Sequence, residues 1–170
     1  LRAQLGEMML PMLIGMTERG PESAGMAVFT ASVAHGRRKF SVYGGSSDAP
    51  WDRFETDAVQ ALGAGTTLQA RANHAVLETA ASPDVVRTWL AGSYPSRHLL
   101  SVGRSIDLYK DTGSPAEVAA RYRFSGLSGS HLVGHTRMAT ETAVTPARAH
   151  PFTAGEDFCL VHNGSLSNPN

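Results

Sequence analysis

Apolar residues recur every three or four positions along the first part of the chain, between Arg2 and Thr17. The repeat consists of Leu5, Met8, Met9, Met12, Leu13 and Met16. This spacing predicts an amphipathic helix whose apolar stripe packs into a core. Pro11 lies inside the stripe, where it either kinks the helix or marks a later start, because proline removes a helical hydrogen bond.

The next apolar segments are short and have the composition of β-strands. Residues 25–29 and 39–43 read as two strands, and the glycine-containing residues 35–38 between them predict an antiparallel hairpin. Residues 44–50 are rich in glycine and serine and predict a loop. A helix from Trp51 to Leu62 is expected to follow.

Helix start signals recur in the middle of the chain. Ser82-Pro83 resembles an N-cap followed by proline at the first helical position, and Ser114-Pro115-Ala116-Glu117 has the spacing of a capping box. We expect a strand near Thr67 to Ala70, and two short strands around Gly103-Arg104. Together these elements predict an α+β fold with sheets flanked by helices.

Composition excludes several functions. The 170 residues carry 15 Lys plus Arg and 15 Asp plus Glu, so the chain has no general attraction to nucleic acid or to an anionic membrane. No apolar run approaches the roughly 20 residues that span a bilayer. The single cysteine cannot form an internal disulfide, so we expect a cytoplasmic protein. The length suits one domain over residues 1–170, and no Cys/His/Asp/Glu spacing predicts a metal site.

A polar turn follows the predicted strand at residues 129–137. It places the Arg137 guanidinium at the edge of a sheet. Arginine donates two parallel hydrogen bonds, so it is suited to bind the α-carboxylate of an amino acid, and Thr140 adds a hydroxyl group three residues later. A surface or interdomain ion pair is the alternative role of Arg137.

A second strand, at residues 158–161, leads into Asn163-Gly164. This dipeptide is typical of a tight hairpin turn. Alternatively, the Asn163 side-chain amide and the Gly164 backbone N–H form an oxyanion hole, and the dipeptide alone leaves both interpretations open. Cys159 lies within the apolar strand, which favours core packing over a role as nucleophile.

Four segments, taken in order, resemble the class II glutamine amidotransferases, whose nucleophile is N-terminal. They are RGPESAG at 19–25, GHTRMAT at 134–140, AHPF at 149–152 and LVHNG at 160–164. Residues 103–110, 117–121 and 162–168 extend the resemblance to the GlxB-like branch, related to the amidotransferase subunits of glutamate synthase and N-methylglutamate synthase.

The resemblance implies a four-layer αββα sandwich of the N-terminal-nucleophile hydrolase type. It also implies a glutaminase that hydrolyses L-glutamine to glutamate and ammonia through a cysteinyl thioester. In such a site, Arg137 and Thr140 bind the amino-acid end of glutamine, and Asn163 and Gly164 form the oxyanion hole.

Two further residues receive supporting roles from the same resemblance. Arg19 organises the loop of the nucleophile or forms a structural ion pair, and His150 orients its own loop or serves as a structural histidine. The nucleophile of the family is an N-terminal cysteine, whereas this chain begins with Leu1. We therefore expect a fragment that is incomplete at both termini, lacks the nucleophile and is inactive alone.

The resemblance also implies partners. Ammonia would pass to synthase subunits in a hetero-oligomer, and any flavin or iron–sulfur group would belong to those subunits, with no cofactor in this chain. Two other functions remain open: a non-catalytic glutamine-binding regulatory or scaffold subunit, and an N-terminal-nucleophile amidohydrolase that acts on another amide.

Overall fold

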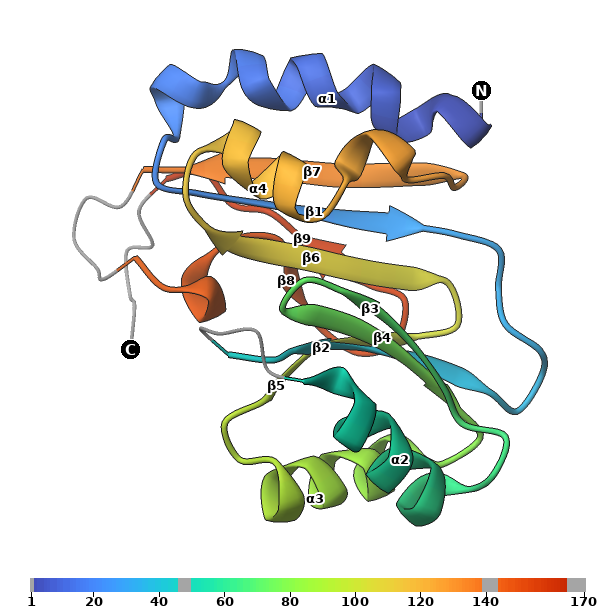
Figure 1. Ribbon diagram of the computed structural model, residues 1–170. Coiled ribbons are helices and arrows are strands. Elements are labelled where there is room, and N and C mark those ends of the chain that lie inside the picture. The colour runs from blue at the N-terminus through green and yellow to red at the C-terminus, as the bar shows by residue number, and fades with distance from the viewer. Residues whose placement is uncertain (1, 46–49, 139–143, 165–170) are drawn as a thin grey trace.

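The computed structural model describes residues 2–45, 50–138 and 144–164, and its centre consists of two antiparallel sheets (Figure 1). The first sheet has the strand order β6-β1-β7 and the second has the order β3-β4-β2-β5. A pair of short strands, β8 and β9, forms a separate ribbon. The strands are β1 (Ser23–Phe29), β2 (Arg38–Tyr43), β3 (Thr67–Arg71), β4 (His74–Thr79), β5 (His98–Gly103), β6 (Ile106–Thr112), β7 (His131–Arg137), β8 (Phe152–Thr153) and β9 (Cys159–Leu160).

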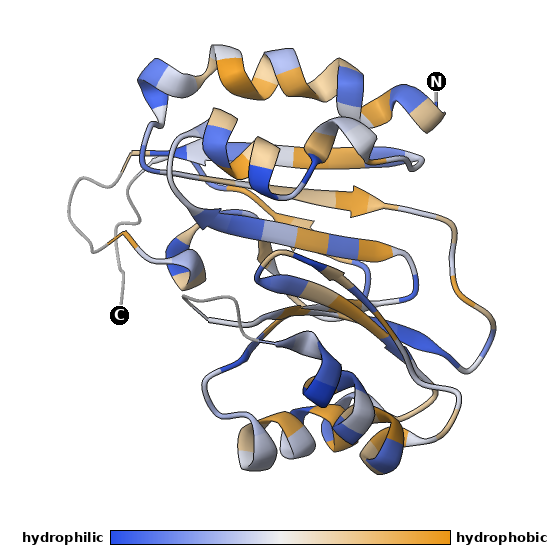
Figure 2. Cartoon of the chain, viewed as in Figure 1, coloured by the Kyte–Doolittle hydropathy of each residue, from blue (hydrophilic) through white to orange (hydrophobic). Residues whose placement is uncertain are grey.

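Helices cover the outer face of each sheet. In Figure 1, α1 (Leu5–Gly15) and α4 (Pro115–Arg121) lie over the first sheet, and α2 (Trp51–Leu62) and α3 (Pro83–Ser93) lie over the second. Figure 2 shows hydrophobic residues on these helices as well as on the strands between them. Short 3-10 turns are η1 (Arg2–Gln4), η2 (Thr17–Arg19), η3 (Phe124–Gly126) and η4 (Pro146–Arg148). The predicted α+β fold class is confirmed.

Three apolar clusters hold these layers together. One joins α1, α4 and the first sheet through residues such as Leu13, Met26 and Tyr122. A second joins α2, α3 and the second sheet, with Phe54 at its centre. The third contains Phe29 of β1 with strand residues of β6. Because alternate residues of a strand face opposite sides, β1 is buried on both faces.

The predicted hairpin between residues 25–29 and 39–43 is wrong. β1 pairs with β6 and β7, whereas β2 pairs with β4 and β5, so the two strands belong to different sheets. Both are central strands with almost continuous burial, and each needs a partner on both edges. The intervening residues therefore cross from one sheet to the other instead of forming a tight turn.

The local helix signals are confirmed. Ser82 caps α3 by accepting a hydrogen bond from the Val85 N–H at 3.5 Å, and Ser114 and Glu117 form the predicted capping box of α4. The first helix starts at Leu5 and runs through Pro11, so the proline does not mark its start. Helix α2 has the predicted bounds.

Polar contacts join the two sheets within this apolar frame. Lys39 of β2 forms an ion pair with Asp107 of β6 and donates a hydrogen bond to the Thr30 hydroxyl at 2.8 Å. The Leu108 N–H donates to the Ser41 hydroxyl at 2.9 Å. These contacts fix the register of one sheet against the other. None of the helices in the described segments is both long enough and apolar enough to cross a membrane.

Candidate functional site

The turn at residues 20–22 lies against the end of β7. Pro21 forms a β-bridge with Arg137, and the Glu22 N–H donates to the Arg137 carbonyl at 3.2 Å. A Cβ atom at Gly20 would lie 2.5 Å from the Arg137 nitrogen and 2.6 Å from the Thr136 hydroxyl. Gly20 is therefore required for this close approach, which fixes the backbone of Arg137 at the end of an edge strand.

Gly25 provides a second close approach, in the middle of β1. It pairs with Lys110 on one side and with His135 on the other. A Cβ atom at Gly25 would lie 2.1 Å from the His150 carbonyl oxygen and 2.6 Å from the Lys110 Cβ. The absence of a side chain thus lets the loop that carries His150 rest directly on the first sheet.

Lys110 of β6 fixes the loop that carries His150 by hydrogen bonds. Its buried ammonium group donates hydrogen bonds to three backbone carbonyls, those of Ala147 at 3.3 Å, Ala149 at 2.8 Å and Pro151 at 3.3 Å. It also lies 4.9 Å from the centre of the Phe152 ring. Burial lowers the pKa of Lys110 to about 8. The lysine thereby fixes the position of His150, which precedes a cis-proline.

Three histidines gather where the loop meets β7 and the end of the described chain. The rings of His135 and His150 have centroids 4.3 Å apart, and the backbone of His162 lies close enough to His135 to raise its pKa slightly, against the larger effect of burial. Burial, with smaller contributions from His135, Arg137 and Lys110, lowers the pKa of His150 to about 4. Burial also lowers the pKa of His135. Both rings are therefore neutral near pH 7.

The segment before Asn163 is anchored by Asp157. Its carboxylate accepts hydrogen bonds from the backbone N–H groups of Arg104, Ser105 and Ile106, at 2.8 to 3.0 Å, and from the Ser105 hydroxyl at 2.9 Å. A Cβ atom at Gly103 would lie 2.2 Å from an Asp157 carboxylate oxygen. The turn between β5 and β6 therefore fixes β9, and β9 leads into His162 and Asn163.

The predicted site residues occupy different environments. Arg137 ends β7 and is half-buried, in the electrostatic neighbourhood of His135 and His150. Arg19 ends η2 on an exposed surface, and its residue directly precedes the turn that contacts Arg137. Thr140 lies outside the described residues. The structure thus brings residues 19–25, the described residues 134–138 and residues 149–152 to one region of the first sheet.

Asn163 and Gly164 are exposed and follow β9. Gly164 has a φ of 139°, whereas Asn163 does not adopt a positive φ. A type I′ turn needs positive φ at both central residues, so Asn163-Gly164 is not a turn of this type. Their neighbour His162 contacts His135, which places the dipeptide beside the same histidine cluster.

Cys159 is half-buried and packs against the apolar cluster that contains Phe29 and Leu108. Burial raises its pKa, which lowers the fraction of reactive thiolate at neutral pH. The prediction that this cysteine packs in a core is confirmed.

Lys110 and Asp157 were not among the predicted site residues, although they position the two loops. The signal for Lys110 was its place in a strand directly after Leu108 and Tyr109, because a buried lysine needs several acceptors. Asp157 adopts a positive φ of 52°, and no local sequence pattern predicted this backbone conformation.

Comparison with known proteins identifies the class. No protein-family model matches the chain. It is 43% identical over 171 residues to the glutamine amidotransferase-like protein GlxB of Rhizobium meliloti, an alignment that covers 100% of this chain and 56% of that protein. It is also 36% identical over 76 residues to the glutamine–fructose-6-phosphate aminotransferase (isomerizing) of Methanococcus maripaludis, covering 44% of this chain and 13% of that protein. The enzyme of that name from Acidithiobacillus ferridurans is 38% identical over 77 residues, with the same coverage of both chains.

These matches show that the chain is a relative of the glutamine amidotransferases. Within them it belongs with the GlxB-like proteins, to which it is similar along its whole length. The chain spans 56% and 57% of the lengths of the first two relatives that it matches.

Proposed function

We propose that this chain forms the substrate-binding and oxyanion-stabilising part of a class II glutaminase domain, which releases ammonia from L-glutamine for a partner synthase. The observation that carries the proposal is the convergence of separate segments on one region. Gly20 and Gly25 admit the Arg137 backbone and the His150 loop, and His135 joins that loop to His162.

The arrangement of layers supports this assignment. Helices α1 and α4, the β6-β1-β7 sheet, the β3-β4-β2-β5 sheet, and helices α2 and α3 follow one another as layers in Figure 1. We assign this order to the αββα sandwich of N-terminal-nucleophile hydrolases, as one domain. Arg137, the proposed ligand of the substrate carboxylate, lies at the end of β7.

The proposed nucleophile is a cysteine at the N-terminus of the processed polypeptide, outside the 170 residues. Its α-amine takes the thiol proton, and the thiolate attacks the carboxamide carbon of glutamine. The electron pair moves to the carbonyl oxygen, where the Asn163 amide and the Gly164 N–H donate hydrogen bonds. When the tetrahedral intermediate collapses, the α-ammonium group returns its proton to the nitrogen of the former carboxamide, which leaves as ammonia. Water then hydrolyses the thioester, which releases glutamate and restores the thiol.

Arg137 is proposed to hold the α-carboxylate of glutamine, with the Thr140 hydroxyl as a second donor. Fixing the amino-acid end in this way restricts the carboxamide to one orientation and lowers the entropic part of the barrier. Arg19, directly before the turn on Arg137, is proposed to organise the loop of the nucleophile.

His135 and His150 are assigned to positioning. Because burial lowers the pKa of both rings, both are neutral near pH 7, and we assign neither the role of general acid. Proton transfer therefore falls to the α-amine of the nucleophile. The histidine pair instead keeps the His150 loop and the segment leading to Asn163 at a constant distance.

The ammonia acceptor is proposed to be a separate synthase of the glutamate synthase or N-methylglutamate synthase type, in a hetero-oligomer. Any flavin or iron–sulfur chemistry would reside on those subunits. We assign the protein to the cytoplasm, where glutamine is available and a catalytic thiol stays reduced.

The test is to supply the full-length protein with L-glutamine and to measure glutamate and ammonia together. Equal release of both supports the proposal, and replacing the N-terminal cysteine by serine should abolish it. Binding of glutamine without turnover would instead indicate a regulatory or scaffold subunit. Hydrolysis of another amide, with none of glutamine, would indicate a different amidohydrolase.

A further inference from the structure

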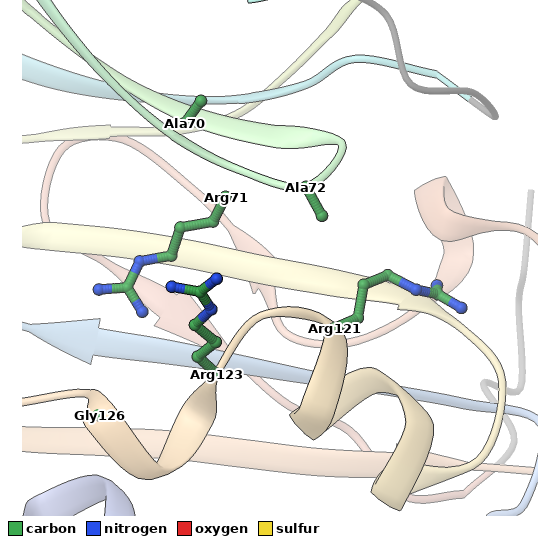
Figure 3. A pocket seen from close by; sticks show the side chains of 6 residues that line it. All are labelled: Ala70, Arg71, Ala72, Arg121, Arg123 and Gly126. Atoms are coloured by element: carbon green, nitrogen blue, oxygen red, sulfur yellow. The ribbon is translucent and has the colours of Figure 1, made fainter.

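A pocket rich in arginine lies between the end of β3 and the segment after α4. Its volume is about 540 Å³, within the range of roughly 300–1,000 Å³ that is usual for small-molecule sites. The six lining residues are Ala70, Arg71, Ala72, Arg121, Arg123 and Gly126 (Figure 3). Of these six lining residues, three are arginines and none is acidic, so the lining of the pocket carries a positive charge.

One of the three arginines is already neutralised. Arg121 donates a hydrogen bond to the buried Asp111 carboxylate at 2.6 Å, and Figure 3 shows its side chain directed away from the other two. The remaining positive charge of the pocket therefore comes from Arg71 and Arg123.

Arg71 and Arg123 reach into the same space from opposite walls. In Figure 3, the Arg71 side chain extends from the β3 end and the Arg123 side chain from the segment after α4, toward each other. Arg71 donates to the Tyr122 carbonyl at 3.2 Å and lies 5.6 Å from the centre of the Tyr109 ring, both of which are neutral partners. Within the described segments, no hydrogen bond or ion pair involves the Arg123 side chain.

This placement is unfavourable without an anion. Two guanidinium groups directed into one pocket repel each other. The Asp107 carboxylate offsets part of the charge of Arg71, whereas the Arg123 side chain has no acidic partner among the described residues. In addition, Arg123 has a φ of 52°, in the left-handed region that is unfavourable for a residue other than glycine. Strained positions of this kind concentrate at binding sites. The chain as a whole carries no net charge, so the excess is local.

We propose that the arginine pocket binds a small molecule that carries an oxyanion, a phosphate or a carboxylate group, between Arg71 and Arg123. Planar guanidinium groups bind such oxygens with paired hydrogen bonds, and the anion removes the repulsion between them. The volume exceeds that of a single oxyanion, so the pocket also accommodates the body of the molecule. None of the proposed glutamine-binding residues lines this pocket, so the site is separate from the proposed function.

The experiment titrates the full-length protein with inorganic pyrophosphate and with citrate by isothermal calorimetry, at constant ionic strength. We expect saturable binding of at least one probe, and a tenfold or larger increase in Kd in Arg71→Gln and in Arg123→Gly. The second variant removes the guanidinium and also relieves the positive φ, so it should fold at least as well as the parent protein. Arg87→Gln, on the outer helix α3, makes the same charge change outside the pocket and serves as the matched control.

Binding of pyrophosphate alone would assign a phosphate-bearing ligand, and binding of citrate alone would assign a carboxylate-bearing one. The proposal is overturned if neither probe binds saturably. It is also overturned if Arg123→Gly binds as tightly as the parent protein, or if Arg87→Gln weakens binding to the same extent as the pocket variants.

Discussion

Replacing Lys110 by methionine should release the loop that carries His150. Methionine retains an unbranched apolar side chain, so the substitution mainly removes the ammonium group. Three backbone carbonyls, at Ala147, Ala149 and Pro151, then lose their donor. The hydrogen bonds to the last two are buried, so water replaces the donor poorly there.

The expected loss follows from these contacts. Each buried carbonyl left without a donor costs about 1–3 kcal/mol, which gives about 2–6 kcal/mol for two. The parent protein in turn bears the desolvation of a buried ammonium group, which lowers the pKa of Lys110 to about 8. Since methionine avoids this penalty, we expect the free energy of unfolding to fall by about 2–4 kcal/mol.

Urea unfolding of the full-length protein, followed by circular dichroism, measures this change. Limited proteolysis within residues 144–156 should accelerate in the same variant, because the loop loses its main attachment. Arg87→Met removes a positive charge from an exposed helix position and should change stability by less than about 0.5 kcal/mol. A similarly small change in Lys110→Met, with unaltered proteolysis, would refute the role given to this lysine.

Three other predictions concern the frame around the site. Burial lowers the pKa of His74 to about 3, against 6.5 for an unperturbed histidine, so below about pH 6.5 the unfolded chain binds a proton that the folded protein does not. The free energy of unfolding should therefore fall by about 2 kcal/mol at pH 5. His74→Gln should remove this loss and flatten the acid side of a plot of stability against pH. Gly25→Ala forces a methyl group onto the His150 carbonyl and should lower the melting temperature and the glutaminase rate, whereas Gly15→Ala, with open space around it, should be close to neutral in both assays. Asp157→Asn presents an amide to backbone donors and should destabilise the protein by about 2–4 kcal/mol in urea unfolding, a prediction that an unchanged midpoint would contradict.

Local signals in the sequence predicted local structure well. The caps at Ser82 and Ser114 lie within three residues of the groups they satisfy, so the sequence window contains the whole interaction. The pairing of β1 and β2 failed for the opposite reason. Their partners lie far along the chain, and the choice depends on burial of both faces, which a short window does not reveal.

The strand β4 was missed because it follows a tight turn in which Ala72, not glycine, adopts a φ of 51°. The candidate site shows the same division. Arg137 and the Asn163-Gly164 dipeptide were found by their motifs, while the close approaches at Gly20 and Gly25 and the contacts of Lys110 required three dimensions. The sequence motifs therefore predicted the candidate chemical groups, whereas the residues that position these groups became visible only in the folded structure.

The most direct test of the proposed site separates substrate binding from the chemical step. Steady-state glutaminase kinetics of the full-length protein would compare Asn163→Ala, Arg137→Ala and the control Arg87→Ala. Loss of one oxyanion-hole donor should lower kcat by about 100- to 1,000-fold with a small change in KM, since that contact strengthens only in the transition state. Arg137→Ala should chiefly raise KM for glutamine, and Arg87→Ala should change neither constant. Unchanged kcat in Asn163→Ala together with unchanged KM in Arg137→Ala would contradict the assignment of this site.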